Sequence, residues 1–247
     1  MAIYHLRFGL VQRSKGQSAV TVAADRARVR LHDKRLDRMQ APLPAKRGRV
    51  PILSKVLLPD GAPERWHDRD MLWNEVEACG CQRNACLARE VEFALPAELL
   101  PYQAAALARD YVSMAFVAEG MAADLNVHWA LRPDGQPRPY AQVLLTMRRI
   151  GAEGFGFKKP AWNDRAAALR WRQLWAVMAN ICLAAHGHAA RIDHRSHTER
   201  GNALEPQNKI GPHAARGEPS ERVDEHRAIA RRNAERTVGR AIGKPSR

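Results

Sequence analysis

The sequence contains no apolar run long enough to cross a membrane. No window approaches the roughly 18 to 20 uninterrupted apolar residues that a membrane-spanning helix requires. The first residues, MAIYHLRF, also lack the long apolar core of a secretory signal peptide. We therefore expect a cytoplasmic protein.

Acidic residues are too few to balance the basic ones. The chain has 40 Lys and Arg against 26 Asp and Glu, which gives a formal net charge of +14. The excess is concentrated in residues 26–55, which hold ten Lys and Arg but only two acidic residues, Asp33 and Asp37. Such an excess favours a polyanionic partner, with nucleic acid as the first candidate and an anionic membrane surface as the second.

Cysteine is also scarce, with four residues, and three of them cluster as C-x-C-x4-C at Cys79, Cys81 and Cys86. In a cytosolic protein, cysteines at such spacing can ligate zinc. No histidine or fourth cysteine follows at a usual ligand spacing. We therefore favour the simpler interpretation, in which these small residues pack a helix interior.

Short stretches rich in apolar residues, several of them alternating with polar ones, predict five strands. In the first strand, Ile3, His5 and Arg7 share one side. The last two strands are separated by RPDGQPRP, which is typical of a hairpin loop. The five strands are expected within residues 1–13, 51–63, 89–96, 125–131 and 140–147.

Longer stretches with helical periodicity separate these strands. Ser18 can cap a helix over about residues 19–39, in which Val22, Val29 and Leu36 recur at a seven-residue interval. The other helices are expected over 68–88, with Leu72, Val76 and Leu87 inward, over 98–120, ending at Gly120, over 162–187, ending at Gly187, and over 221–240.

Five strands with helices between and around them, and few tight βαβ crossovers, predict an α+β fold with a largely antiparallel sheet. The polar stretch with Gly and Pro that follows the long fourth helix is the segment most typical of a linker. We expect one domain over residues 1–197, a linker over 198–218 and a basic C-terminal helix over 219–247.

A small polar cluster is expected on the last two strands. Alternation puts Tyr140 and Gln142 on one face of their strand, and the hairpin can place His128 beside them. In the strand REVEFALP, Glu90 and Glu92 likewise share a face. A single histidine on a strand is usually a core or edge residue, so the pattern alone does not establish a metal site.

Several long motifs carry a family resemblance. QSAVTVAADR, LAREVEFALP, NVHWALRPDGQPRPYAQVLLTMR, GFGFKKPAWN and ARIDHRS occur in this order. With these motifs the chain resembles the MobA/MobL family of plasmid mobilisation relaxases over nearly its whole length. The resemblance implies a palm of antiparallel strands backed by helices. It also implies a reaction in which one DNA strand is cut at a transfer origin and a tyrosine is joined to the 5′ phosphate.

The resemblance also implies four site positions. The family holds a divalent metal with three histidines, and its lone histidine corresponds to His128. Its paired histidines, in motifs like NPHAHVMLT, correspond to Tyr140 and Gln142 of RPYAQVLLT. Its nucleophilic tyrosine, in motifs like SAVAAAAYR, corresponds to Asp25 of SAVTVAADR. Three of the four residues that define the chemistry are therefore replaced.

These replacements argue against a stable catalytic metal, because one amide oxygen and one neutral hydroxyl replace two imidazoles. If the site is functional, Mg²⁺ or Mn²⁺ is the expected ion. Two alternatives keep the chemistry: Tyr140 acts as a displaced nucleophile, or Asp25 acts as a metal ligand or carboxylate nucleophile. The family's acidic residues on the third strand orient a metal histidine, so Glu90 or Glu92 could pair with His128, or could simply balance neighbouring arginines.

Basic residues that could follow a DNA backbone remain present. Phe155, Phe157 and Trp162 are interleaved with two of them and suit stacked bases, whereas the alternative is a solvated charge run. The expected DNA contacts are Arg26, Arg28, Arg30, Lys34 and Arg35 on the first helix, Lys46, Arg47 and Arg49 after it, Lys158 and Lys159, and Arg191 and Arg195. Arg191 and Arg195 could instead help to close the fold.

Four functional hypotheses follow. The first is a catalytically impaired mobilisation protein that binds single-stranded or hairpin transfer-origin DNA, with relaxosome or coupling proteins as further partners and no membrane. The second is an active relaxase that uses non-standard residues, and the third is a non-enzymatic relaxosome partner or regulator. The fourth is genetic decay, against which the intact surrounding motifs argue. Family members often continue into helicase or primase regions, and we interpret this chain as the relaxase domain alone.

Overall fold

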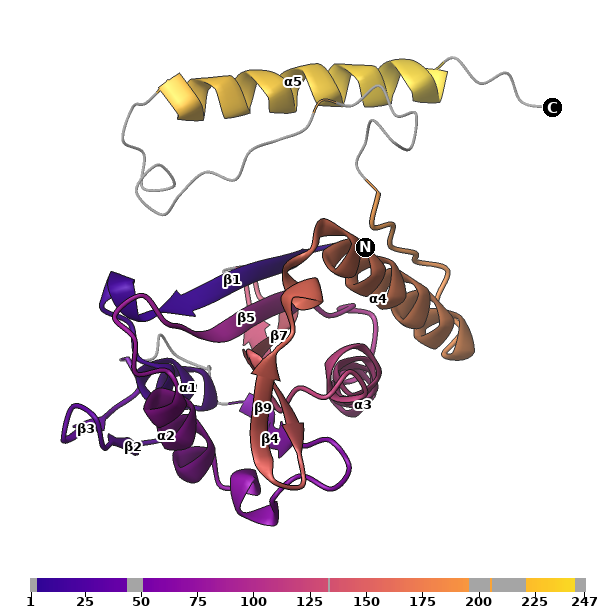
Figure 1. Cartoon of the computed structure of the whole chain (residues 1–247). Coiled ribbons are helices and arrows are strands. Elements are labelled where there is room, and N and C mark those ends of the chain that lie inside the picture. The colour runs from indigo at the N-terminus through magenta and orange to yellow at the C-terminus, as the bar shows by residue number, and fades with distance from the viewer. Residues whose placement is uncertain (1–3, 44–50, 133, 196–204, 206–220, 243–247) are drawn as a thin grey trace. The chain divides into compact units, whose positions relative to one another are not determined.

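The structure is a computed structural model that describes residues 4–43, 51–132, 134–195, 205 and 221–242. The chain divides into two compact units, Met1–Asp193 and His194–Arg247, and each is described by itself. In Figure 1 the colour follows the chain from the N-terminus to the C-terminus. No helix among the described residues is long and apolar enough to cross a membrane.

A five-stranded antiparallel sheet forms the centre of the first unit, which confirms the α+β class and all five expected strands. The strand order is β1-β5-β7-β6-β4, and each neighbouring pair is antiparallel. The expected hairpin is the β6–β7 pair at the centre of the sheet. The strands are β1 (Leu6–Gln12), β4 (Pro51–Leu57), β5 (Cys86–Ala94), β6 (Ala123–Leu131) and β7 (Pro137–Thr146).

Helices α3 (Pro101–Val112) and α4 (Arg165–Ala185) cover one face of this sheet. Alternate strand residues such as Phe93 pack there against Tyr111 and Trp175 in a buried aromatic cluster. A π-helical turn, Ser113–Val117, extends α3. The short η4 (Pro160–Asn163) precedes α4.

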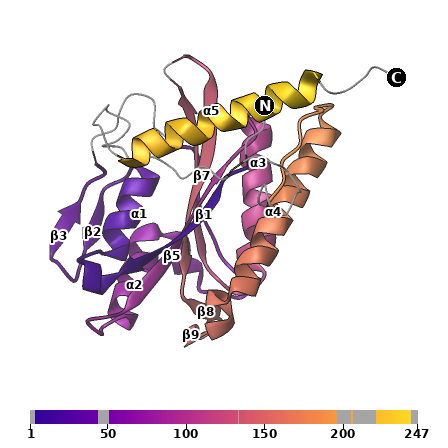
Figure 2. The same cartoon turned by 90° about the horizontal axis from the view of Figure 1, so that it is seen from above.

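Helices α1 (Ala19–Ala27) and α2 (Arg69–Cys79) pack on the other face and cover only one end of it. Figure 2 shows these two helices on one side of the sheet and α3 and α4 on the other. Their core includes Trp73 against Leu144 and Val56, near the ends of the strands. Towards the other end, this face carries polar side chains. The short helices η1 (Arg13–Lys15) and η2 (Glu64–His67) precede α1 and α2.

The expected helix over residues 19–39 is wrong in its second half. Ser18 caps α1 as predicted, but α1 ends at Ala27 and Arg28 adopts a left-handed conformation with φ 60°. A small hairpin follows, made of β2 (Leu31–Asp33) and β3 (Arg38–Gln40). Tertiary contacts favour the hairpin, because the buried Asp33 carboxylate accepts hydrogen bonds from the Ser18 hydroxyl and the Leu36 backbone N–H.

The expected helix over residues 68–88 is also too long. It ends at Cys79 with Gly80 as its C-cap, and Leu87 is buried as part of β5 instead of the helix. The Gly187 helix end is confirmed, because this glycine has φ 76° just beyond α4.

A second small hairpin was not predicted. It consists of β8 (Arg148–Gly151) and β9 (Gly154–Lys158) and follows directly after β7. Phe155 attaches it to the core by stacking on Trp66 at 4.3 Å between ring centroids. The second unit contains α5 (Glu221–Ile242), and Arg232 on this helix is ion-paired with Glu205.

Candidate functional site

A row of polar side chains crosses the sheet on the face opposite α3 and α4. Arg7 on β1 pairs with Glu92 on β5, and Glu92 pairs with Gln142 on β7. Gln142 also faces Asn126 on β6, and Asn126 faces Ser54 on β4. Directly paired residues of antiparallel strands project from the same face, so these five side chains form a continuous line, which we call the polar row.

His128 and Tyr140 form the next pair along the hairpin. They lie directly opposite each other, and their rings stack with centroids 4.8 Å apart and planes 17° apart. His128 is buried, and Tyr140 is half-buried beside it. The hairpin therefore brings together His128, Tyr140 and Gln142, as strand alternation predicts, whereas their chemical roles stay predictions.

The Glu92 carboxylate is held by His5, which directly precedes β1, and by Gln142 on β7. Its Oε2 accepts a hydrogen bond from Gln142 Nε2 at 3.2 Å, and its Oε1 lies 3.6 Å from His5 Nε2. The hydrogen bond with His5 is the largest influence on the pKa of Glu92, and the Gln142 hydrogen bond and the Arg7 charge act in the same direction. Together they outweigh burial and lower the pKa of Glu92 to about 2. Glu92 is therefore ionised at neutral pH.

Asp25 lies near the end of α1, and both of its carboxylate oxygens accept hydrogen bonds. Oδ2 accepts from Arg26 Nη1 at 2.8 Å, whereas Oδ1 accepts from Arg28 Nη1 at 3.2 Å and from the Leu43 backbone N–H at 3.0 Å. Arg26 also donates from Nε to Glu90 Oε1 at 2.6 Å, which connects α1 to β5. Asp25, Arg26 and Glu90 thus form one charged chain that begins on α1 and ends on the same face as the polar row.

His5, Arg7 and Asn126 were not among the predicted site residues. Alternation already puts His5 and Arg7 on one side of the first strand. Neither could be assigned to the site from sequence, because only the fold places β1 beside β5.

Comparison with known proteins identifies the family. Residues 17–220 match the model of the MobA/MobL family. This chain belongs to the MobA/MobL family.

Individual relatives agree with this assignment. The chain is 36% identical over 245 residues to "Mobilization protein MobL" of Acidithiobacillus ferridurans, an alignment that covers 87% of this chain and 63% of the relative. It is 30% identical to "Probable mobilization protein MobA" of Bifidobacterium longum, over 94% of this chain and 48% of the relative. The chain thus spans between about half and two thirds of the length of these two proteins.

A solved structure is also similar. The structure titled "Molecular Basis of Vancomycin Resistance Transfer in Staphylococcus aureus" superposes with a TM-score of 0.71 at 28% identity. The match covers 79% of this chain and 100% of that chain. This agreement is independent support for the relaxase-type fold of the MobA/MobL chain.

The side chains at the positions that we expect to correspond to the family's metal histidines do not fit a three-histidine site. They provide one imidazole from His128, one phenol from Tyr140 and one carboxamide from Gln142. The nitrogen of that carboxamide donates to Glu92, and the phenol ring is stacked on the imidazole. Within the described part of the chain, no group of three or more His, Cys, Asp or Glu side chains is arranged to hold a metal ion.

The basic residues expected on the first helix are distributed differently in the structure. Arg26 is on α1 and Arg28 is its C-cap, and both are ion-paired with Asp25. Arg35 lies beyond the helix and is ion-paired with Glu77. Among these predicted contacts, the exposed residues Arg30 and Lys34 flank the short strand β2. Lys46, Arg47 and Arg49 lie outside the described residues.

The second group of expected DNA contacts lies on and beside the β8–β9 hairpin. Lys158 and Lys159 are exposed, and Phe157 is 90% exposed. Phe155 and Trp162 are not available to stack on bases, because Phe155 packs on Trp66 and Trp162 is buried. This hairpin follows the end of β7 that is distant from Tyr140.

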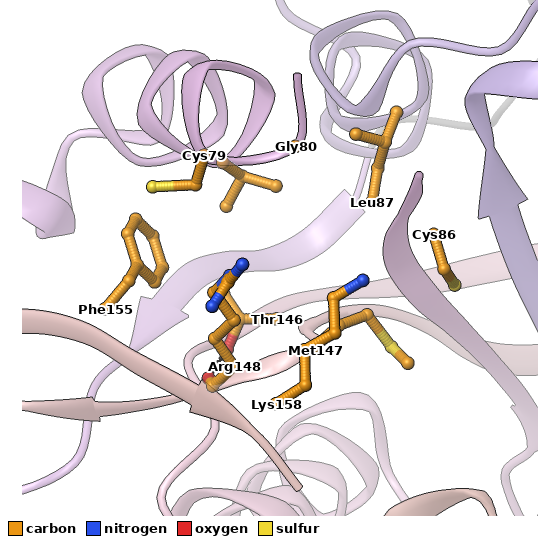
Figure 3. Close-up of a pocket in the computed structure, with 10 residues that line it drawn as sticks. Cys79, Gly80, Cys86, Leu87, Thr146, Met147, Arg148, Phe155 and Lys158 are labelled. Carbon is orange, nitrogen blue, oxygen red and sulfur yellow. Dashed lines mark hydrogen bonds between the residues drawn. The ribbon is translucent and has the colours of Figure 1, made fainter. Parts of the chain in front are cut away.

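The cysteine cluster does not pack a helix interior, contrary to the expectation. Cys79 ends α2, Cys81 is exposed in the following turn, and Cys86 begins β5. Cys79, Cys86 and Lys158 are among the residues that line a cavity of about 20 Å³. Figure 3 shows these side chains. Burial raises the pKa of the Cys86 thiol, with the charge of Lys158 acting in the opposite direction.

The last predicted contacts follow α4. Arg191 donates hydrogen bonds to the carbonyl oxygens of His188 and Ala190, which closes the local turn. Arg195 is exposed. These hydrogen bonds agree with the structural alternative for Arg191 while leaving its contact with DNA a prediction.

Proposed function

We propose that this chain is a MobA/MobL mobilisation protein that binds single-stranded or hairpin DNA at a transfer origin and is impaired in the family's nicking reaction. The family match supports a role in mobilisation. The formal net charge of +14 supports binding to a polyanion. Relaxosome or coupling proteins are the further partners that this role implies, and the cytoplasm is the compartment in which such DNA is found.

The contacts of the substituted residues carry the proposed impairment. Gln142 and Asp25 are hydrogen-bonded to groups of the protein itself, to Glu92 in one case and to two arginines in the other. A carboxylate that is already paired with two guanidinium groups is a poor nucleophile, because attack would break both ion pairs. In our proposal Asp25 and Gln142 therefore have structural roles. The protein keeps its DNA-binding surface but is impaired in the nicking reaction.

Exposed basic and aromatic groups support the proposed DNA binding. Arg30 and Lys34 near β2 can contact phosphates, and so can Lys158 and Lys159. Phe157 beside Lys158 offers an exposed ring on which an unpaired base can stack.

The first test is an assay for a covalent protein–DNA adduct on a denaturing gel. Single-stranded oligonucleotides that tile the transfer origin of the same genetic element would be incubated with Mg²⁺ or Mn²⁺. The natural chain would be compared with the triple variant Asp25→Tyr, Tyr140→His, Gln142→His. We expect adduct and nicked strand from the triple variant and at least about 100-fold less from the natural chain, because even indirect changes around a metal cost about 10- to 100-fold.

The matched control adds His128→Ala to the triple variant and should abolish the adduct. Adduct formation by the natural chain at a similar rate would show that the proposed impairment is wrong. Mapping the linked residue would then distinguish Tyr140 from Asp25 as the nucleophile. Failure of every variant to bind the oligonucleotides would instead contradict the DNA-binding function and favour a protein partner.

A further inference from the structure

The Asp25 carboxylate lies within a set of donors that converge on it from three residues. Arg26 and Arg28 each donate from Nη1, and Leu43 donates its backbone N–H. Two guanidinium groups and a backbone amide are the donors with which proteins commonly bind phosphate groups. A carboxylate can take the place of a phosphate there because both present several negatively charged oxygens.

The same donors are held in place by contacts that do not involve Asp25. Arg26 Nε and Nη2 both contact Glu90 Oε1, at 2.6 and 2.5 Å, so only its Nη1 is directed at Asp25. Arg28 Nη1 also donates to the Leu43 carbonyl oxygen at 2.6 Å. Because these contacts would survive the loss of the Asp25 charge, the donors are preorganised for an anion.

The group is accessible to solvent. The side chains of Asp25, Arg28 and Arg26 are 15%, 16% and 26% exposed. An anion from solvent can therefore compete with the carboxylate for these donors.

We infer that Arg26, Arg28 and the Leu43 backbone N–H form a phosphate-binding site that the chain fills with its own Asp25 carboxylate. Asp25 then acts as an internal competitor of any phosphate group, either inorganic phosphate or a phosphate of a DNA strand. The DNA part of this inference rests on the proposed function, whereas the inorganic phosphate part does not.

The test uses Asp25→Asn, which keeps the shape of the side chain and removes its charge. Asp37→Asn is the matched control, because it changes the net charge equally. The Asp37 side chain is 96% exposed and lies beside His32, with no ion pair to Arg26 or Arg28 among the described contacts. Asp25→Ser is a second variant in case the asparagine disturbs folding, and cooperative thermal unfolding checks all three proteins.

Two measurements are made on each protein. Inorganic phosphate is titrated at constant ionic strength against chloride, and the unfolding temperature is followed. Binding of a single-stranded oligonucleotide is measured by fluorescence anisotropy over a range of salt concentrations. We expect phosphate to raise the unfolding temperature of Asp25→Asn more than that of the natural chain or Asp37→Asn. Oligonucleotide affinity should rise about tenfold, as for one gained charge-assisted contact, and the salt slope should steepen by about 0.7.

Adding Arg28→Gln to Asp25→Asn should remove both gains. Equal phosphate responses of Asp25→Asn, Asp25→Ser and the natural chain would overturn the inference. An equal gain in Asp37→Asn would also overturn it, since net charge alone would explain the effect. If phosphate protects Asp25→Asn but no protein binds the oligonucleotide, the phosphate site stands and the proposed DNA-binding function fails.

Discussion

At the residue scale, the ionised carboxylate of Glu92 is stabilised by its neighbours in and beside the polar row. Its carboxylate contacts His5, which directly precedes β1, and Gln142 on β7, and these contacts keep it ionised down to low pH. A histidine in place of Gln142 would present an imidazole, in place of the carboxamide, to the same carboxylate. The glutamine provides a neutral donor to the acidic residue beside it.

A pH-dependent contribution of Glu92 to stability is the prediction at this scale. Its pKa is lowered from 4.5 to about 2 in the folded protein, so the stabilisation is present above pH 4.5 and is lost as the pH falls towards 2. Glu92→Gln should reduce the free energy of unfolding at pH 7 by about 1 kcal/mol, after allowance for solvent screening.

The measurement is urea unfolding of both proteins at a series of pH values. The difference between them should shrink between pH 4.5 and about 2. A difference that stays constant over this range would show that the Glu92 charge does not stabilise the fold. Glu64→Gln is a suitable control, because the Glu64 side chain is 92% exposed beside His67, away from the polar row.

At the scale of elements, the β8–β9 hairpin contains two phenylalanines that the sequence pattern does not distinguish but whose environments differ. Phe155 and Phe157 belong to the same GFGFKK motif, and strand alternation puts them on one side. Phe155 nevertheless stacks on Trp66, whereas Phe157 is 90% exposed beside Lys158. Phe155 therefore attaches the hairpin to the core, and Phe157 is available to a ligand.

We predict that replacing each of these phenylalanines with alanine affects a different property of the protein. Phe157→Ala should leave the unfolding temperature unchanged but weaken single-stranded DNA binding by about 1–3 kcal/mol, through the loss of one base-stacking contact. Phe155→Ala should instead lower stability by about 2–4 kcal/mol, because it removes a packed aromatic ring. Thermal unfolding and fluorescence anisotropy on both variants provide the check. Equal DNA affinity of Phe157→Ala and the natural chain would remove the hairpin from the DNA surface.

At the scale of the whole molecule, the distribution of charge bears on the proposed binding of DNA. The formal net charge is +14, but several of the arginines predicted to contact DNA are ion-paired within the fold. The number of phosphates contacted should therefore be smaller than the count of basic residues suggests.

The salt dependence of DNA binding measures this number. Each phosphate contacted on a single strand contributes a slope of about −0.7 in log K against log salt, so four to six contacts would give about −3 to −4. We expect a slope in this range from anisotropy titrations with oligonucleotides of equal length. A slope near zero would contradict binding through phosphates. Arg30→Gln with Lys34→Gln should make the slope shallower by about 1.4.

The sequence by itself determined the five strands, the family and the placement of His128, Tyr140 and Gln142 on one face of the sheet. Alternation along a strand and the short hairpin loop are local properties, and they place these side chains on one face without further information. The same local rules failed for residues 28–39. There the sequence has a helical pattern, but the hydrogen bonds of buried Asp33 favour a hairpin instead. These bonds include one to Ser18, which the periodicity of residues 28–39 does not take into account.

Only the tertiary structure decided what Asp25 and Glu92 contact. Asp25 is paired with Arg26 and Arg28 because α1 ends at a left-handed residue, which brings Arg28 and Leu43 back to the carboxylate. Glu92 is paired with His5 because β1 lies beside β5. Such contacts join residues from separate elements, and their energies depend on distance and burial, which a linear pattern does not contain.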